Sequence, residues 1–84
     1  AKALAERDRY AEAAQAYARA IAVSTDPDAR LLGDYGEAAT IAEGGTVPPE
    51  AIVAFERARA LEPMDPRPRL YLAMAQEQFG DVAG

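Results

Sequence analysis

A pattern of small and aromatic residues occurs twice in the chain and constrains the fold more than any other feature. The residues concerned are Ala51, Phe55 and Ala58 and, 38 positions earlier, Ala13, Tyr17 and Ala20. In each set the spacing is i, i+4 and i+7, which places the three side chains on one face of an α-helix. The chain is therefore predicted to be an array of helical repeats, a scaffold whose usual function is binding.

Apolar residues recur at helical spacing between short stretches rich in Pro, Gly and Asp. The expected helices cover about 10–23, 27–43, 48–62 and 66–79, with a helix tail at 1–6 and the start of a further helix at 82–84. The polar stretch Arg7-Asp8-Arg9 is expected to separate the tail from the first helix, and Gly80-Asp81 is expected to end the last one. The predicted fold is all-α, a helix-turn-helix superhelix (α-solenoid) of about four helices and a partial one.

Two Asp-Pro pairs are expected to begin helices. Asp26 and Asp65 are good N-cap residues. The following Pro27 and Pro66 have the fixed φ that suits the first helical position. Gly44-Gly45 is a typical C-terminal signal, because glycine adopts the left-handed conformation that ends many helices.

The core prediction rests on aromatic and small residues. The aromatic residues predicted to be buried are Tyr10, Tyr17, Tyr35 and Phe55. The inner stripe of the last helix is predicted to comprise Leu72, Ala73, Ala75, Gln76 and Phe79. Tyr71 lies between this stripe and the opposite face, so its position stays open. Gly36 lies on a buried stripe although glycine costs about 1 kcal/mol in a helix interior, which indicates the close approach of the backbone of a neighbouring helix.

Composition excludes several classes of function. The chain has no Cys and no His, which removes thiol nucleophiles, disulfides, the usual zinc sites and the commonest general base. Fourteen acidic and nine basic residues give a net charge of −5, and the basic residues do not cluster with aromatics as a nucleic-acid surface requires. No apolar run approaches the roughly 20 residues that span a bilayer. We expect no catalytic residue, metal, cofactor, nucleic-acid partner or direct membrane contact.

The helix pairs resemble the tetratricopeptide repeat (TPR), which has small and aromatic residues at fixed positions and a closing proline. The matching residues are Tyr10, Ala13, Tyr17 and Ala20 in one unit, Leu32, Tyr35, Gly36, Ala51, Phe55, Ala58 and Pro63 in the next, and Leu72, Ala73 and Gly80 in a third. Leu32 and Arg69 stand where the family usually has a large aromatic residue. The resemblance implies one TPR-array fragment over 1–84, with a partial repeat at 1–26, a complete repeat at 27–63 with an insertion at 44–46, and a partial repeat at 64–84.

The insertion and its flanks are similar to the TPR domain of the CcmI/CycH proteins of bacterial cytochrome c maturation. The likeness rests on Leu31-Leu32, Asp34-Tyr35, Glu37-Ala38, the Gly44-Gly45 turn, Pro49-Glu50-Ala51, Phe55-Glu56-Arg57-Ala58, Pro66 to Leu72 and Gly80-Asp81. It implies a chaperone domain on the periplasmic side of a membrane-anchored parent protein in the inner membrane; a cytoplasmic location is the alternative. It also implies that the domain holds apocytochrome c by the C-terminal helix of that client and passes it to the haem-ligation complex.

In a repeat array of this kind, the first helix of each unit lines a concave groove. The predicted groove residues are Arg30, Gly33, Glu37, Thr40 and Ile41, and Arg67, Leu70, Met74, Glu77 and Gln78. An amphipathic helix can bury its apolar face on Ile41, Leu70 and Met74 and meet charged residues at the rim. The alternative is that these residues have no role in binding: Met74 packs inside the fold, and Arg30 and Arg67 are solvated surface residues.

Other interpretations use other parts of the surface. The domain is alternatively a generic TPR adaptor or scaffold, which holds an unrelated partner in a multiprotein complex through outer residues such as Glu56, Arg57 and Arg59. Some TPR domains resemble one another in binding the C-terminal carboxylate of a partner with Lys, Asn and Arg on the groove face. Such a carboxylate clamp is not supported, because the positions concerned hold Gly33, Glu37, Leu70 and Met74. The exposed repeat ends at 1–6 and 82–84 are expected to support self-association.

Overall fold

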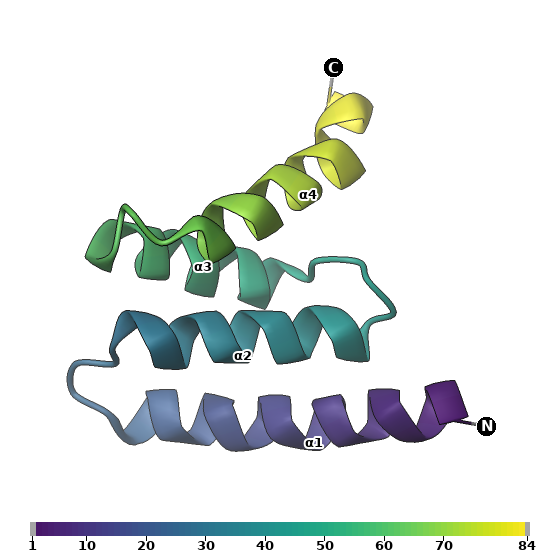
Figure 1. The fold of residues 1–84 in the computed structure, drawn as a ribbon, viewed down its shortest axis with the longest axis horizontal. Helices are drawn as coiled ribbons and strands as arrows, with labels where there is room; N and C mark the ends of the chain where they lie inside the picture. Colours follow the sequence, from purple (N-terminus) through teal and green to yellow (C-terminus); the bar gives the residue numbers. More distant parts are fainter. Residues whose placement is uncertain (1, 84) are drawn as a thin grey trace.

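Four α-helices make up the computed structural model, which describes the backbone of residues 2–83 and the side chains of residues 6–79. The helices are α1 (Lys2–Val23), α2 (Ala29–Ala42), α3 (Pro49–Leu61) and α4 (Pro66–Ala83). Figure 1 shows α1, α2 and α3 side by side in one layer, with α4 turning back along α3 and then rising away from it. The molecule measures 37 × 37 × 19 Å and is therefore a slab. The all-α class is confirmed, while the superhelix stays a prediction.

The first residue of α2 lies two positions later than the sequence predicted. Asp28, and not Asp26, is the N-cap, since its backbone is extended (φ −83°, ψ 169°) and its Oδ1 accepts a hydrogen bond from Leu31 N at 2.8 Å. Pro27 is buried and precedes the cap. The Asp26-Pro27 prediction is thus wrong. The physical reason is that the helix formers Ala, Arg and Leu follow Asp28 directly, which brings a free N–H within reach of its carboxylate.

The other signals from Gly and Asp-Pro are confirmed. Gly44 and Gly45 have positive φ angles of 75° and 104°, so they end α2 in the left-handed conformation. Pro66 opens α4, where Asp65 Oδ1 accepts a hydrogen bond from Arg67 N at 3.1 Å. These local devices fix where the chain turns.

Two predicted helix breaks are wrong. α1 continues through Arg7-Asp8-Arg9, and α4 continues through Gly80-Asp81 as far as Ala83. Neither stretch contains Pro. The side chains of Arg7, Asp8 and Arg9 are exposed, and polar side chains on an exposed helix face do not interrupt the backbone hydrogen bonds. The expected tail at 1–6 is part of α1. The sequence predicts self-association through this tail and through 82–84. Most of the side chains of these residues lie outside the described ones.

The core is centred on Phe55, which α3 inserts between α2 and α4. The ring is completely buried, and a Cβ built on Gly36 would lie only 2.6 Å from it. The space that Gly36 leaves is therefore filled by a ring and not, as the sequence predicted, by the backbone of a neighbouring helix. On α4, the Tyr71 ring stacks on Phe55 with centroids 4.8 Å apart and planes inclined by 3°. Two buried clusters form the interior: Ala39, Val47, Ala51, Phe55 and Ala75 in one, and Ala29, Leu32, Ala54 and Ala58 in the other.

The tyrosines are less buried than the sequence predicted. Tyr17 and Tyr35 are half-buried, and Tyr10 is 39% exposed, so the assignment of Tyr10 to the core is wrong. The reason is that, among the described helices, α1 packs against α2 alone. A side chain on α1 therefore has a neighbouring helix on one side at most.

The predicted inner stripe of α4 faces the interior only in part. Ala75 is buried and Leu72 is half-buried, whereas Ala73 and Gln76 are exposed and Phe79 is 45% exposed. α3, the main neighbour of α4, covers the side of the helix that carries Ala75. The assignment of Ala73, Gln76 and Phe79 to the interior is therefore wrong.

Replacing Gly36 with Ala is expected to lower the free energy of unfolding by up to about 2 kcal/mol. The added methyl would collide with the buried Phe55 ring, and overpacking costs about 1–3 kcal/mol, which exceeds the gain of up to about 1 kcal/mol in helix propensity. Chemical denaturation measures the change. Gly33→Ala is the control, because there the methyl would meet the Arg67 guanidinium, whose partly exposed end can move aside. Equal stability of the two variants would contradict tight packing around Phe55.

Candidate functional site

α2 and α4 lie side by side and run in the same direction, although α3 separates them in the sequence. The polar contacts between the two segments join Asp34 with Arg67, Glu37 with Tyr71, and Gly45 with Gln78. In these three contacts the paired residues are 33 or 34 positions apart, which indicates that the two segments run in the same direction. Ile41 and Met74 are also 33 positions apart in the sequence. The two helices predicted to line a groove therefore share one surface.

Arg67 is the centre of the polar contact between α2 and α4. Its Nη1 donates a hydrogen bond to Asp34 Oδ1 at 2.8 Å and lies 3.9 Å from Glu37 Oε1. Its Nη2 donates to the carbonyl oxygen of Arg30 at 3.3 Å. The side chains of Arg67 and Asp34 remain 27% and 30% exposed, so this pair contributes about 1 kcal/mol at most. Its main effect is to orient α4 on α2.

Tyr71 combines a role in the core with a role in the polar contact. One face of its ring stacks on Phe55, and its hydroxyl donates a hydrogen bond to Glu37 Oε2 at 3.0 Å. Burial raises the pKa of the Tyr71 phenol above its ordinary value of 10.0, and the hydrogen bond to Glu37 raises it further. The phenol is therefore protonated, and a donor, at neutral pH.

Gln78 holds α4 to the loop between α2 and α3. Its Oε1 accepts a hydrogen bond from Val47 N at 2.9 Å, and its Nε2 donates to the carbonyl oxygen of Gly45 at 2.9 Å. Val47 is completely buried, so its N–H has no access to water in place of this bond. The loop between α2 and α3 is thus anchored on α4.

The predicted groove residues differ widely in burial. Arg30, Leu70, Glu77 and Gln78 are exposed, Glu37, Ile41, Arg67 and Met74 are half-buried, and Gly33 and Thr40 are buried. Thr40 does not reach the surface, because its Oγ1 donates to the carbonyl oxygen of Gly36 at 2.8 Å inside the fold. Met74 packs against the buried cluster that contains Phe55. Leu70, 60% exposed, is the most accessible apolar side chain of this set.

Asp34 and Tyr71 take part in this surface but are absent from the predicted groove set. Each lies on the same helix face as a residue that was predicted, Asp34 three positions before Glu37 and Tyr71 four positions after Arg67. The spacing alone could have included them. Their partners, however, lie on another helix and depend on the parallel pairing of α2 with α4.

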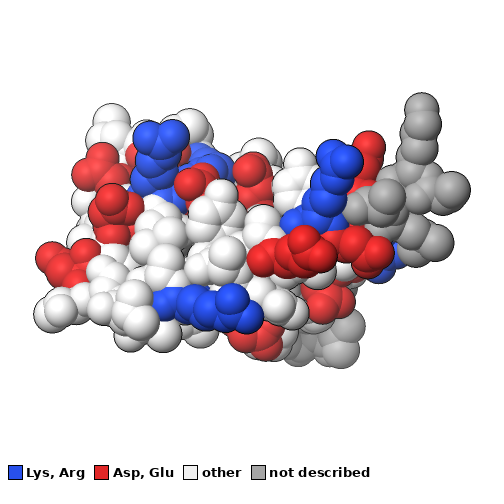
Figure 2. Space-filling view, turned by 90° about the horizontal axis from the view of Figure 1, so that it is seen from below, with Lys and Arg blue, Asp and Glu red and all other residues white. Residues whose placement is uncertain are grey.

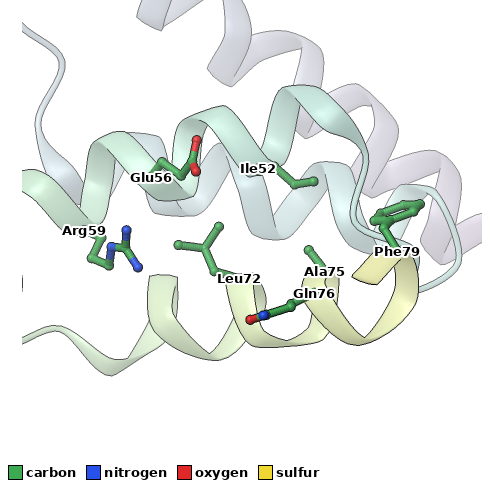
Figure 3. Close-up of a pocket in the computed structure, with 7 residues that line it drawn as sticks. All are labelled: Ile52, Glu56, Arg59, Leu72, Ala75, Gln76 and Phe79. Carbon is green, nitrogen blue, oxygen red and sulfur yellow. The ribbon is translucent and has the colours of Figure 1, made fainter. Parts of the chain in front are cut away.

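A separate cleft of about 350 Å³ lies between α3 and α4. It is lined by Ile52, Glu56, Arg59, Leu72, Ala75, Gln76 and Phe79. Figure 3 shows Ile52, Leu72 and Ala75 pointing into the space between the two helices, with Phe79 at one end. The cleft thus combines an apolar floor with a charged rim, and none of its residues belongs to the predicted groove.

Over residues 2–83, no helix combines the length and the apolar character that are needed to cross a bilayer. Among the side chains of residues 6–79, no three acidic groups gather as metal ligands would.

The chain is similar to two curated bacterial proteins, each described as cytochrome c-type biogenesis protein CycH. It is 40% identical to the one from Bradyrhizobium diazoefficiens over 72 residues and 43% identical to the one from Rhizobium meliloti over 75 residues. Over most of its length, the chain is homologous to CycH. The matched regions cover 86% and 89% of this chain but 19% of each relative, so the chain spans about a fifth of a CycH protein. No protein-family model and no solved structure matches the chain.

Replacing Gln78 with Leu is expected to lower the free energy of unfolding by about 1–3 kcal/mol, because it leaves the buried Val47 N–H without an acceptor. Gln78→Glu is the matched control, since it keeps the acceptor for Val47 and loses only the donor to Gly45. Hydrogen exchange of the Val47 amide measures the difference. Exchange should be fast in the Leu variant and slow in the Glu variant; slow exchange in both would show that Gln78 does not hold the loop.

Proposed function

We propose that this domain binds an amphipathic helix of a client protein on the surface shared by α2 and α4, and that the client is apocytochrome c. Homology to proteins described as cytochrome c-type biogenesis proteins supports a role in cytochrome c biogenesis. The TPR resemblance supports the choice of α2 and α4, because the first helices of successive repeats line the concave side of such an array. The role is one of assembly, carried out by binding and without a catalytic residue or cofactor of this domain.

The proposed mode of binding rests on an aliphatic strip that lies beside an ordered polar network. Leu70 and Met74 follow Arg67 at i+3 and i+7, so all three lie on one face of α4. Ile41 is the corresponding aliphatic residue of α2. Because the polar contacts join α2 to α4, the strip and the charges beside it have a fixed spacing. A client helix can bury its apolar face on the strip and pair its polar residues with the rim.

The charge of the chain favours a basic client. The net charge of −5 attracts positively charged segments over several ångströms and raises the rate of encounter at low ionic strength. Glu77 is exposed on the α4 side of the surface, and Arg30 is exposed on the α2 side. The two ends of a bound helix would therefore meet charges of opposite sign, which would give the complex one preferred orientation.

The proposed setting follows from the same homology. The domain would face the periplasm in a parent protein anchored in the inner membrane, and it would pass the client to the subunits that attach haem. Neither step requires chemistry by the domain itself. Release of the client needs only a moderate affinity, as is typical of a helix held in an open groove.

Calorimetric titration with a synthetic peptide of the C-terminal helix of an apocytochrome c tests this proposal. The native peptide should bind saturably, and a scrambled peptide should not. Leu70→Glu is expected to weaken binding at least about tenfold, which is about 1.4 kcal/mol, because it places a charge in the aliphatic strip. Leu61→Glu is the matched control, since Leu61 is 49% exposed on α3 and lies outside the predicted groove.

Two outcomes would contradict the proposal. Absence of heat with the native peptide, from a domain shown to be folded by circular dichroism, would exclude this client. Equal weakening by Leu70→Glu and Leu61→Glu would exclude the α2–α4 surface as the site, because only the general charge of the domain would then matter.

A further inference from the structure

A second groove, called the α1–α3 groove here, runs along α2 between α1 and α3. Two adjoining cavities of about 240 and 310 Å³ form it, and they share Ala18, Tyr35 and Glu50 as lining residues. In the part of the chain that the structure describes, α1 and α3 each pack on α2 and not on each other. α2 is therefore the floor of the groove, and the two neighbouring helices are its walls.

The α1–α3 groove and the predicted groove use different faces of α2. The floor residues of the α1–α3 groove are Leu32, Tyr35, Ala39 and Ala42. The residues of α2 that belong to the predicted groove and reach the surface are Arg30, Glu37 and Ile41. With 3.6 residues per turn, the centres of these two sets are about 160° apart around the helix. A ligand in one groove therefore leaves the other groove free.

Small and apolar side chains line most of the α1–α3 groove. α1 contributes three alanines, Gln15 and Ile21, and no charged residue. Figure 2, which shows the α1 side of the molecule, has an uncharged area between acidic and basic side chains. On α3, Val53 lines the groove and is 55% exposed. Because the distance between packed helices depends on the side chains at the contact, these small residues allow a partner helix to approach closely.

Three charged residues give the α1–α3 groove a direction. Glu43 lines one cavity, Arg57 lines the other, and Glu50 lines both. All three side chains are exposed, and the ion pairs found among residues 6–79 involve none of them. Glu50 and Arg57 are seven positions apart on α3, which is about 10 Å along the helix axis. A partner therefore meets negative and positive charges at a fixed spacing.

The charge of Glu50 also acts on the floor of the groove. Burial raises the pKa of the Tyr35 phenol above its ordinary value of 10.0, and the negative charge of Glu50 raises it further. The phenol is therefore protonated at neutral pH and can donate a hydrogen bond to a polar group of a partner.

We infer that the α1–α3 groove binds an amphipathic α-helix of a partner protein, with an acidic residue at Arg57 and a basic residue seven positions later at Glu50. Residues seven positions apart lie on one face of a helix, as the two charges of α3 do. α1 and α3 both run from the Glu43 cavity to the Arg57 cavity, so the partner helix is antiparallel to both walls. Its acidic residue comes first and its basic residue last, which also suits the dipole of the partner helix.

Two synthetic peptides of about 16 residues, each with Leu on one helix face, test this inference. In the first peptide Glu precedes Lys by seven positions, and in the second peptide the two are exchanged. The chain is compared with its charge-swapped variant, Glu50→Lys combined with Arg57→Glu, which keeps the net charge of −5. Calorimetric titration measures the affinities, amide chemical shifts locate the bound peptide, and circular dichroism checks the fold of each variant.

The chain should prefer the first peptide and the charge-swapped variant the second, so that the ratio of the two affinities changes at least about tenfold. Any difference in helicity between the peptides cancels in this comparison. The shifts should gather at Ala18, Tyr35 and Ala54. Val53→Glu should weaken the binding of both peptides, and Leu61→Glu, on α3 outside the groove, is its control. Leu70→Glu, which tests the predicted groove, should leave both affinities unchanged.

Three results would overturn the inference. An equal ratio of affinities in the chain and the charge-swapped variant, or no binding of either peptide, would show that the charges of the groove do not select a helix. Shifts gathered on Ile41, Leu70 and Met74 would place the peptides in the predicted groove. Protection of the Ala18 and Tyr35 surroundings in a longer CycH chain without peptide would show that the groove holds a segment of its own chain.

Discussion

The buried ring of Phe55 joins three of the four described helices, and the rest of the structure depends on this contact. α3 provides the ring, Gly36 lets it reach the backbone of α2, and Tyr71 of α4 stacks on it. Burial of such a side chain contributes about 1.5–3 kcal/mol, and aromatic stacking adds about 0.5–1.5 kcal/mol. The partly exposed pair of Arg67 with Asp34 contributes about 1 kcal/mol at most. Apolar packing therefore holds α4 in place, and the polar contacts adjust its orientation.

The position of α4 determines two surfaces of the molecule, the predicted groove and the cleft between α3 and α4. On one side, polar contacts join α4 to α2, and the proposed binding strip of Ile41, Leu70 and Met74 belongs to these two helices. On another side, α4 and α3 leave an open cleft with an apolar floor. A change that released the Phe55 ring from Tyr71 would alter both surfaces at once, although neither ring belongs to the predicted groove or lines the cleft.

Local features of the sequence predicted the number, the order and most of the ends of the helices, because periodicity and the signals of Gly and Pro act over a few residues. The choice between Asp26 and Asp28 as the cap depends on which N–H comes within reach, and a dipeptide signal does not specify that. Periodicity placed Thr40 on the groove face, whereas the structure buries it, because spacing alone does not show how closely neighbouring helices cover a residue. The contacts of Arg67 and Gln78 join residues more than 30 positions apart, so they depend on tertiary structure.

A double-mutant cycle between Phe55 and Tyr71, measured as the free energy of unfolding, tests the role of the stacked rings most directly. Phe55→Leu and Tyr71→Leu each remove one ring and keep an apolar side chain, and the double variant removes both. If the stacked rings join α3 to α4, the two losses are not additive, and the coupling energy is about 0.5–1.5 kcal/mol. Losses that simply add would show that α4 is held by other contacts, and would contradict the dependence of both surfaces on Phe55.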